Sequence, residues 1–480
     1  MNLKNFVGVY KKHICPYPVL LVLPAYDRFY KKYLKTDLRG IYVLIDDGVW
    51  DTFVEEKYWN KGKEGMFRLF KKNSKIIDEF SKKFREVSKE FLKFTKSLDR
   101  DYSKLSNKDL LDLYKKYNQK YVGSFIYGEC PAETLKEFLE PELNNILLSI
   151  VKDRKKLNKI FSLLTIPSKE SFVTKEEKDL LEIVALAKEK KDTKSRLKKH
   201  ILKYNWVPVD YNGDAWTLED FEERIKVILE YGIDPNKRLM EIEENSVKLK
   251  EDQLKAKKEY NIDDETFSLC LETQKCMVLM DLKKEFYSKA HYHVQFLIRE
   301  IGKRIGLSLT QANYLTPNEV EKALNENKAD KKILDDRYKK SVYFAEGFGV
   351  WFLDKKEEKE VRKVLDKKHD GDLLDGVCGN PGHVKAKVRV IVENKDFSKF
   401  QKGEILVTAY TTPDFVSIMK KASGIVTDRG GVTSHSSIIS RELDIPCVVG
   451  TNHATKILKD GDLIEINADD GFVKKVKNNK

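Results

Sequence analysis

One short segment of the chain combines a histidine with glycines and small hydroxyl side chains. An apolar run ends at Thr427, Gly430-Gly431 follows, and His435 comes directly after Thr433 and Ser434. The residues after His435 (SSIISREL) have the apolar spacing of an amphipathic helix. His435 is therefore predicted at the start of a helix, just after a glycine turn that lets the backbone approach another group closely.

Such a position favours an anion and suits a histidine that takes up a phosphoryl group. Free backbone N–H groups and the positive end of the helix dipole attract negative charge. A neutral imidazole can attack a phosphorus centre, and the hydroxyls of Thr433, Ser434, Ser436 and Ser437 can donate to phosphate oxygens. A histidine is more often structural than catalytic. The glycine pair, the hydroxyls and the helix start single out His435 among the 8 histidines of the chain.

The glycine content indicates that the chain has two parts. Of the 24 glycines, 11 lie from Gly371 onward, whereas the first 370 residues are poor in glycine and show helical periodicity. We expect an α+β multidomain protein. A large, mainly helical domain would span residues 1–353, with short strands in 1–60, and a compact α/β domain would span 376–480. The charged segment 354–375 is predicted to be a linker that acts as a hinge.

The expected elements follow from periodicity and turn signals. In the N-terminal domain, strands are expected at 17–25 and 40–45, with a turn at Asp46-Asp47-Gly48. Helices are expected at 61–98, 106–121, 131–160, 174–203, 217–230, 236–260, 263–305 and 316–327. In the C-terminal domain, strands are expected at 385–392, 404–408, 424–427, 446–450 and 463–466, and helices at 413–421 and 435–443.

The segment GGVTSH at 430–435, followed by IISRELDIP at 438–446, resembles the phosphohistidine signature of the PEP-utilising enzymes. This family includes phosphoenolpyruvate synthase, pyruvate phosphate dikinase and rifampicin phosphotransferase. The resemblance extends over residues 376–477, through Asn380-Pro381-Gly382, Gly403–Val407, Thr412-Pro413-Asp414, Asn452, Ala454-Thr455 and Asp460-Gly461-Asp462. The sequence departs from the family at Ala386, where glycine is common, and at Ser436-Ser437, where alanines are usual.

The resemblance implies a swivelling domain whose histidine takes a phosphoryl group at one station and delivers it at another. The implied site comprises the nucleophile His435, the catalytic hydroxyl neighbours Thr433 and Ser434, and the phosphate-binding residues Gly430, Gly431, Arg429 and Arg441. Either arginine could instead form a surface ion pair.

Residues 1–370 have neither a glycine-rich phosphate loop nor the strand–helix alternation of an ATP-grasp domain. They resemble, more faintly, the helical acceptor-binding domain of rifampicin phosphotransferase-like proteins. The matching segments are 204–208 with 216–220, and 281–285 with 306–307 and 315–320. In the second of these, Asp281, Lys284 and Glu285 fall on one face of a predicted helix. These acceptor-side candidates could orient and deprotonate a hydroxyl, or they could form a solvated ion-pair face.

Composition bears on partners and location. The formal net charge is +13, but lysine is mixed with glutamate along segments such as 175–191, which is typical of solvated helices, so we expect no nucleic-acid partner. No apolar run is long enough to span a bilayer, and no signal peptide is evident, so a cytoplasmic protein without membrane contact is expected. The 6 cysteines are scattered and are expected to be reduced, and no metal site is predicted.

These observations predict an enzyme component, a phosphotransferase that works through a phosphohistidine intermediate. No cofactor is expected on this chain. A separate ATP-grasp-like or PEP-binding partner would hold ATP and Mg²⁺ and phosphorylate His435, and the acceptor would be a small molecule. One alternative is a split PEP synthase-like subunit that acts on pyruvate with a barrel supplied elsewhere. Another is a degenerate binding or regulatory protein that keeps the domain without its chemistry.

Overall fold

The computed structural model describes residues 6–13, 17, 20–209, 214–230, 234–346, 349–365, 373–392, 394–411, 415–428, 430, 434–451 and 454–476. The chain forms two compact units. Unit 1 comprises Met1–Glu140, Pro167–Glu251 and Glu272–Leu365, and unit 2 comprises Pro141–Ile166, Asp252–Leu271 and Asp366–Lys480. Two helical segments from the middle of the sequence thus belong with the C-terminal domain.

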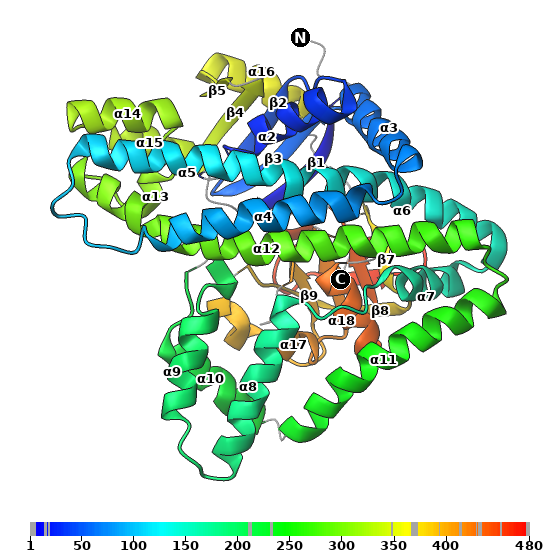
Figure 1. The fold of residues 1–480 in the computed structure, drawn as a ribbon. Helices are drawn as coiled ribbons and strands as arrows, with labels where there is room; N and C mark the ends of the chain where they lie inside the picture. The colour runs from blue at the N-terminus through cyan, green and yellow to red at the C-terminus, as the bar shows by residue number, and fades with distance from the viewer. Residues whose placement is uncertain are drawn as a thin grey trace. The chain divides into compact units, whose positions relative to one another are not determined.

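Unit 1 contains a five-stranded antiparallel sheet in the order β1-β3-β2-β4-β5 (Figure 1). Its strands are β1 (Phe6–His13), β2 (Ile41–Asp46), β3 (Val49–Glu55), β4 (Lys340–Glu346) and β5 (Gly349–Phe352). The expected turn joins β2 to β3, with φ of 46° at Asp47 and 75° at Gly48. The short strands expected in residues 1–60 are joined by β4 and β5, which were not expected, and β4 pairs with β2 from about 300 residues away along the chain.

The rest of unit 1 is mostly helical (Figure 1). The helices of the chain before residue 366 are α2 (Val22–Phe29), the π-helix η2 (Tyr30–Leu34), α3 (Glu56–Lys72), α4 (Ile76–Lys96), α5 (Asn107–Gly128), α6 (Cys130–Val151), α7 (Arg154–Thr165), α8 (Phe172–Lys188), α9 (Lys194–Tyr204), the 3-10 turn η3 (Val207–Val209), α10 (Leu218–Glu230), α11 (Pro235–Glu259), α12 (Asp264–Arg304), α13 (Leu309–Ala312), α14 (Pro317–Glu326), α15 (Lys331–Lys339) and α16 (Lys355–Leu365). The division between the units crosses α6 at Pro141, a residue that cannot donate a helical hydrogen bond.

The strand expected at residues 17–25 is wrong, because α2 begins at Val22. Leu20, Leu21 and Leu23 are buried, but a short apolar run fits a buried strand and a buried helix equally well. Pro24 is no obstacle, since the first turn of a helix needs no amide donor there.

Three long helices expected from periodicity are each split in two: α3 and α4, α6 and α7, and α8 and α9. The chain turns at Lys152 and Lys190, both in the left-handed conformation, with φ of 58° and 57°. Lysine is not typical of turns, so no local signal marks these two positions. By contrast, the cap at Thr316 is a full capping box with Pro317 at the first helical position, which matches its sequence pattern.

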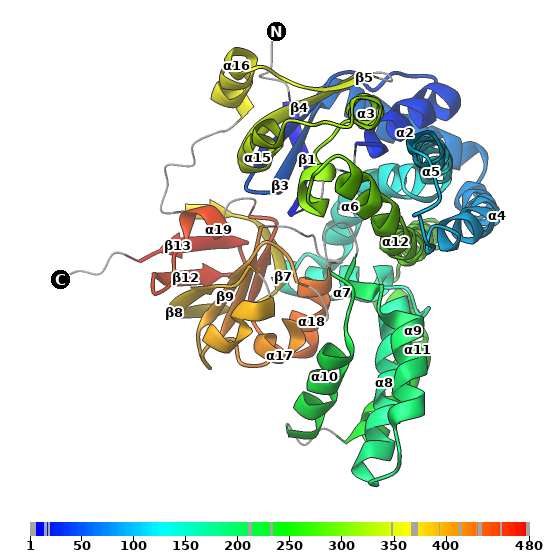
Figure 2. The same ribbon diagram turned by 90° about the vertical axis from the view of Figure 1, so that its left-hand side faces the viewer.

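Aromatic side chains hold the helices of unit 1 together. Phe84 and Phe91 of α4 lie 5.3 and 5.4 Å, ring to ring, from Phe286 of α12, and Tyr121 of α5 lies 4.8 Å from Tyr287. These three helices run side by side (Figures 1 and 2). The aromatic positions of the predicted helices are therefore core, as residues at helical spacing usually are.

The charged segment predicted as a hinge begins with a folded helix. Val361 and Leu365 of α16 pack on Tyr42 and Leu44 of the unit 1 sheet. Arg362, also on α16, donates to the carbonyls of Ile45 and Ser341 at 2.8 Å each. Residues 355–365 are thus part of unit 1 rather than linker. Residues 373–375 form a strand of unit 2, and 366–372 lie outside the described residues.

Unit 2 is built on an eight-stranded sheet in the order β6-β13-β12-β8-β9-β10-β11-β7. The strands are β6 (Leu373–Asp375), β7 (Val377–Asn380), β8 (His383–Val390), β9 (Ile405–Thr408), β10 (Gly424–Thr427), β11 (Cys447–Val449), β12 (Leu463–Asn467) and β13 (Phe472–Lys475). The four central strands, β8 to β11, are parallel, and the outer ones are antiparallel. A large helical part followed by a compact α/β domain confirms the expected fold class.

The sheet of unit 2 is covered on both faces, as parallel strands require. Its helical elements are η4 (Asn394–Lys399), α17 (Val416–Met419), α18 (His435–Glu442) and α19 (Ala454–Ile457). Leu406, Ile425 and Cys447 point to the face packed by α17 and α18. Their neighbours Val407, Val426 and Val448 point to the other face, which α19 covers.

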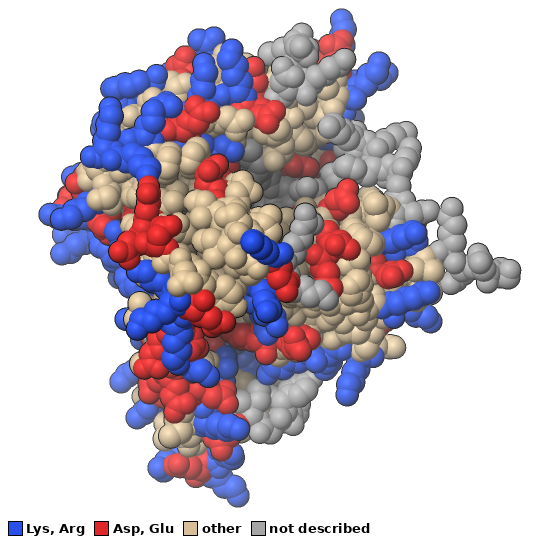
Figure 3. All heavy atoms as spheres, turned by 90° about the vertical axis from the view of Figure 1, so that its right-hand side faces the viewer, with Lys and Arg blue, Asp and Glu red and all other residues tan. Residues whose placement is uncertain are grey.

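The surface carries mixed charge. On the face shown in Figure 3, lysine and arginine side chains are interspersed with aspartate and glutamate. In the described part of the chain, no helix combines the length and the apolar character needed to cross a bilayer. The described cysteines, Cys130, Cys270, Cys276, Cys378 and Cys447, are buried free thiols.

Candidate functional site

The glycine turn and the helix start predicted from the sequence lie at the carboxyl ends of the parallel strands of unit 2. Thr411 follows β9, Asp428 and Gly430 follow β10, and Gly450 follows β11. Ligands of α/β sheets commonly bind at this edge. The helix that follows the glycine turn, α18, begins at His435, as predicted. It packs against β7 and β11, with its N-terminus at the strand ends.

Glycine is required at position 430 for a steric reason. Its φ of +109° is unfavourable for other residues, and a Cβ there would lie 2.6 Å from Oγ of Ser434. Gly450 approaches the same turn, since a Cβ on it would lie 2.9 Å from the carbonyl oxygen of Gly430. Glycine at these two positions therefore allows the turn after β10 and the loop after β11 to come close together at the N-terminus of α18.

Small hydroxyls line the first turn of α18. Ser434 is the N-cap residue, and its Oγ accepts a hydrogen bond from the amide of Ser437 at 3.4 Å and lies 3.1 Å from Oγ of Ser437. The buried Oγ of Ser436 lies 2.8 Å from Oγ1 of Thr411, which ties the loop after β9 to the helix. Serine at 436 and 437, where the family usually has alanine, thus supplies hydrogen bonds. Thr411 was not identified from the sequence.

Asp428 supports the turn through hydrogen bonds. It is another residue that was not identified from the sequence. It is buried, and its carboxylate accepts hydrogen bonds from Oγ1 of Thr451 at 3.3 Å, from the amide of Thr455 at 3.2 Å and from Oγ1 of Thr455. Since Thr455 lies in the first turn of α19, Asp428 joins β10, the loop after β11 and that helix. An acidic residue two positions before Gly430 was the available signal.

Arg441 lies in the last turn of α18, at the end opposite His435. Its Nη1 donates to the carbonyl of Gly379 on β7 at 2.8 Å, and burial lowers the pKa of the guanidinium to about 10. This contact holds the helix against the sheet. A role of Arg441 in binding phosphate stays a prediction.

Part of the predicted site lies outside the described residues. Arg429, Gly431 and Thr433 fall there, as do Thr412, Pro413, Asp414 and Asn452. For His435 the structure gives the backbone, in α18, and not the side chain. Of the predicted residues around the turn, the structure describes Gly430 and Ser434 with their contacts.

The acceptor-side candidates lie on α12 in unit 1. The carboxyl of Asp281 accepts a hydrogen bond from the first amide of α8, Phe172 N, at 3.4 Å, and burial raises its pKa to about 6. Glu285 forms an ion pair with Lys289 at 2.5 Å. Lys284 lies near Asp281, and its side chain is exposed. The three are thus neighbours, and Glu285 has the ion pair expected of a solvated face.

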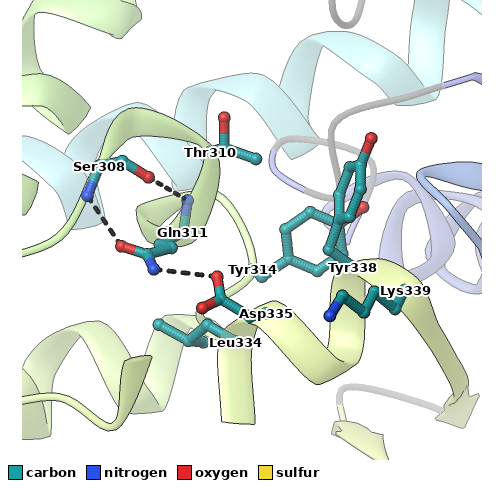
Figure 4. Close-up of a pocket in the computed structure, with 8 residues that line it drawn as sticks. All are labelled: Ser308, Thr310, Gln311, Tyr314, Leu334, Asp335, Tyr338 and Lys339. Atoms are coloured by element: carbon teal, nitrogen blue, oxygen red, sulfur yellow. Dashed lines mark hydrogen bonds between the residues drawn. The ribbon is translucent and has the colours of Figure 1, made fainter. Parts of the chain in front are cut away.

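A pocket of about 280 Å³ in unit 1 is separate from these residues (Figure 4). It is lined by Ser308, Thr310, Gln311, Tyr314, Leu334, Asp335, Tyr338 and Lys339. Gln311 closes the capping box of α13 and also donates to Asp335 at 2.9 Å, so the polar wall is fixed by structural hydrogen bonds (Figure 4). Over the described residues, no three His, Cys, Asp or Glu side chains are placed to hold a metal ion.

Comparison with known proteins points to one family. Residues 400–471 match the family model of the PEP-utilising enzyme mobile domain. A probable phosphoenolpyruvate synthase of Archaeoglobus fulgidus is 39% identical over 192 residues, which cover 37% of this chain and 25% of that protein. The phosphoenolpyruvate synthase of Pyrococcus furiosus is 44% identical over 120 residues, 25% of this chain and 15% of that protein.

The chain spans a quarter or less of the length of these relatives. The solution structure of Enzyme I (nEIt) covers 59% of this chain and 81% of its own, at 18% identity and a TM-score of 0.20, which is too weak a likeness to inform fold or function. The family match and the relatives confirm the expected resemblance of the C-terminal domain to the mobile domain of the PEP-utilising enzymes.

Proposed function

We propose that this chain is a phosphotransferase component that carries a phosphoryl group on His435. The group would come from a separate ATP-grasp-like or PEP-binding partner and pass to a small acceptor. The observation that carries the proposal is the start of α18 at His435, directly after a glycine turn at the carboxyl ends of parallel strands. An anion is stabilised there by the helix dipole and by nearby hydroxyl donors.

The neighbours of the first turn suit a carrier. Ser434, Ser436, Ser437 and Thr411 are neutral hydroxyls, which can donate to phosphate without repelling it. A neutral imidazole attacks phosphorus, and the resulting phosphohistidine keeps its phosphoryl group activated for a second transfer. Mg²⁺ and ATP would be bound by the partner, and the intermediate on this chain would be covalent.

A second candidate is a split PEP synthase-like subunit, in which the acceptor is pyruvate. The names of the two curated relatives favour it. The shared part of those proteins corresponds to at most 37% of this chain, so residues of unit 1 decide between the candidates. Formation of PEP from the phosphorylated chain and pyruvate, with a barrel-containing protein added, would establish this alternative.

The test is phosphorylation of the full chain in its native cells, located by mass spectrometry under non-acidic conditions. We expect the modification on His435 and its loss in His435→Ala. Titration of the purified chain with Mg·ATP should show weak binding or none, as expected if the partner holds the nucleotide. Phosphate at another residue, or normal transfer by His435→Ala, would show that the chain is not a histidine carrier.

A further inference from the structure

The pocket of unit 1 has an acid and a lysine on its wall that are not paired with each other. Asp335 and Lys339 lie four residues apart on α15, a spacing at which opposite charges commonly form an ion pair. Neither charged group forms an ion pair with a described residue. In Figure 4 the amine end of Lys339 is directed to the side of Asp335. The pocket therefore presents one negative and one positive group to a ligand.

Hydrogen-bonding capacity is left over on this wall. Oδ1 of Asp335 accepts a hydrogen bond from Nε2 of Gln311 at 2.9 Å, whereas Oδ2 accepts none from a described residue. A carboxylate oxygen only accepts, and an ammonium group only donates. A ligand that satisfies both Asp335 and Lys339 must therefore present a donor at one end and an acceptor at the other.

Aromatic and aliphatic side chains form the rest of the lining. Leu334 and Tyr314 are buried, each with 2% of its surface exposed, and the ring of Tyr338 lies 5.7 Å from that of Tyr314 at 75°. A further aromatic ring packs well against rings in this arrangement. The volume of about 280 Å³ is just below the range of about 300–1,000 Å³ usual for ligand pockets, so it suits one small molecule rather than a nucleotide or a peptide.

The wall is held in place by hydrogen bonds that do not involve a ligand. Arg337 of α15 donates to both carboxylate oxygens of Glu319 on α14, at 2.8 and 2.7 Å. It also donates to the carbonyl of Tyr314 at 3.1 Å, which ties α15 to the segment after α13. A site that is already ordered loses little conformational entropy when a ligand binds.

We propose that this pocket binds an α-amino acid with an aromatic side chain. The ammonium group of the amino acid pairs with Oδ2 of Asp335, its carboxylate pairs with the ammonium of Lys339, and its ring packs on Tyr314 and Tyr338. All of the lining residues belong to unit 1. The site is separate from His435 and independent of the proposed function.

The charges of the pocket disfavour other classes of ligand. A simple anion is attracted by Lys339 and repelled by Asp335, and a simple cation has the reverse problem, whereas a zwitterion is attracted by both. In the described part of the chain, no group of three acidic, histidine or cysteine side chains is placed to hold a metal ion, so Asp335 has no second ligand for one. An amino acid is the smallest common molecule that carries both charges next to an apolar group.

The experiment titrates the full chain with L-phenylalanine and with two probes that each lack one charged group. N-acetylphenylalanine has no ammonium group, and phenylalaninamide has no carboxylate. Ligand-observed NMR gives the dissociation constant of each. Since Asp335 and Lys339 are exposed to solvent, we expect phenylalanine to bind weakly, with a Kd of about 1 mM. Each probe should bind at least fivefold more weakly than phenylalanine.

Two variants assign each charge of the ligand to its partner. Asp335→Asn should remove the preference for phenylalanine over N-acetylphenylalanine and keep the preference over phenylalaninamide. Lys339→Gln should do the reverse. Asparagine can still accept the hydrogen bond from Gln311, so the wall is preserved. Asp336→Asn and Lys331→Gln, at exposed positions of α15 outside the pocket lining, are the matched controls and should change neither preference.

Several results would overturn the proposal. No binding of phenylalanine up to its solubility limit would show that the pocket is not an amino-acid site. Equal binding of phenylalanine and either probe would show that the pocket does not recognise both charges. If Asp336→Asn weakens binding as much as Asp335→Asn does, the amino acid binds elsewhere on the chain.

Discussion

The glycine turn before α18 yields a sharp prediction, because a matched position exists elsewhere in unit 2. Gly430 and Gly403 both have positive φ, +109° and +89°. A Cβ on Gly403 would meet no atom within 4 Å, whereas one on Gly430 would lie 2.6 Å from Oγ and 2.7 Å from Cβ of Ser434. Gly403→Ala therefore introduces backbone strain alone, and Gly430→Ala adds displacement of the helix cap.

The expected losses of stability follow from the backbone strain and from the displaced helix cap. Backbone strain of this kind costs about 1–3 kcal/mol. Displacing Ser434 also removes its cap on the amide of Ser437, which is worth about 1 kcal/mol. Gly430→Ala should thus destabilise unit 2 by about 1 kcal/mol more than Gly403→Ala. In the background of Ser434→Gly, which removes the obstructing atoms, this excess should disappear.

The assay must report on unit 2 alone. All 5 tryptophans precede residue 366, so tryptophan fluorescence follows unit 1. Native-state hydrogen exchange of amides in β9 and β10 gives the stability of the unit 2 core. On the same samples, phosphorylation of His435 by phosphoramidate should slow at least tenfold in Gly430→Ala and stay normal in Gly403→Ala. Equal rates in the two variants would refute the claim that this turn shapes the phosphorylation site.

Further predictions concern single side chains. His435→Ala should abolish phosphorylation with hydrogen exchange of β9 and β10 unchanged, since removing a nucleophile leaves the described core intact; loss of protection would contradict this. Arg441→Met should destabilise unit 2 by about 2 kcal/mol, because the carbonyl of Gly379 loses a charged donor, and an unchanged stability with slower phosphorylation would instead favour phosphate binding by Arg441. Glu176→Gln should destabilise unit 1 by about 3 kcal/mol in urea unfolding followed by tryptophan fluorescence, because the buried carboxylate is bound bidentately by Arg224, at 2.8 and 2.7 Å, and by His200 at 2.9 Å.

The buried carboxylate of Glu176 also sets a pH dependence. Burial alone would raise its pKa, but His200 and Arg224 lower it below the usual value of 4.5. A depressed folded-state pKa stabilises the fold above the unfolded-state pKa. This contribution should be complete above about pH 5 and should be lost as the pH falls below 4.5 through the folded-state value. Unfolding curves of Glu176→Gln should lack this part of the acid dependence; curves parallel to those of the parent chain would contradict the assignment.

Five of the eight described strands of the C-terminal domain were predictable because their signals are local, whereas β6, β7 and β13 were not expected. Each expected strand there coincides with an observed one within a few residues, since short apolar runs between glycine or charged turns admit few other structures. Unit 1 was less predictable. Pairing of β4 with β2 depends on contacts across about 300 residues, and the turns at Lys152 and Lys190 occur without turn residues. Periodicity therefore found the helices and missed their ends.

The same distinction applies to the candidate site. The start of α18 at His435 could be predicted, because a cap residue and a glycine turn are read from adjacent positions. The contact of Thr411 with Ser436 and the bracing by Asp428 could not, because they join loops that follow different strands. The ion pair of Glu129 with Lys283 was missed for the same reason, since only helix packing brings the two residues together.

The contacts around the first turn of α18 suit a phosphoryl carrier. Around the first turn of α18, the described contacts are made by the neutral hydroxyls of Thr411, Ser434, Ser436 and Ser437. Asp428, the nearby acid, is already occupied by Thr451 and Thr455. A free carboxylate beside the phosphohistidine would repel the phosphoryl group and could activate water against it. Neutral hydroxyls around the first turn, with Asp428 engaged by Thr451 and Thr455, would therefore preserve a phosphoryl group on His435 until it is transferred.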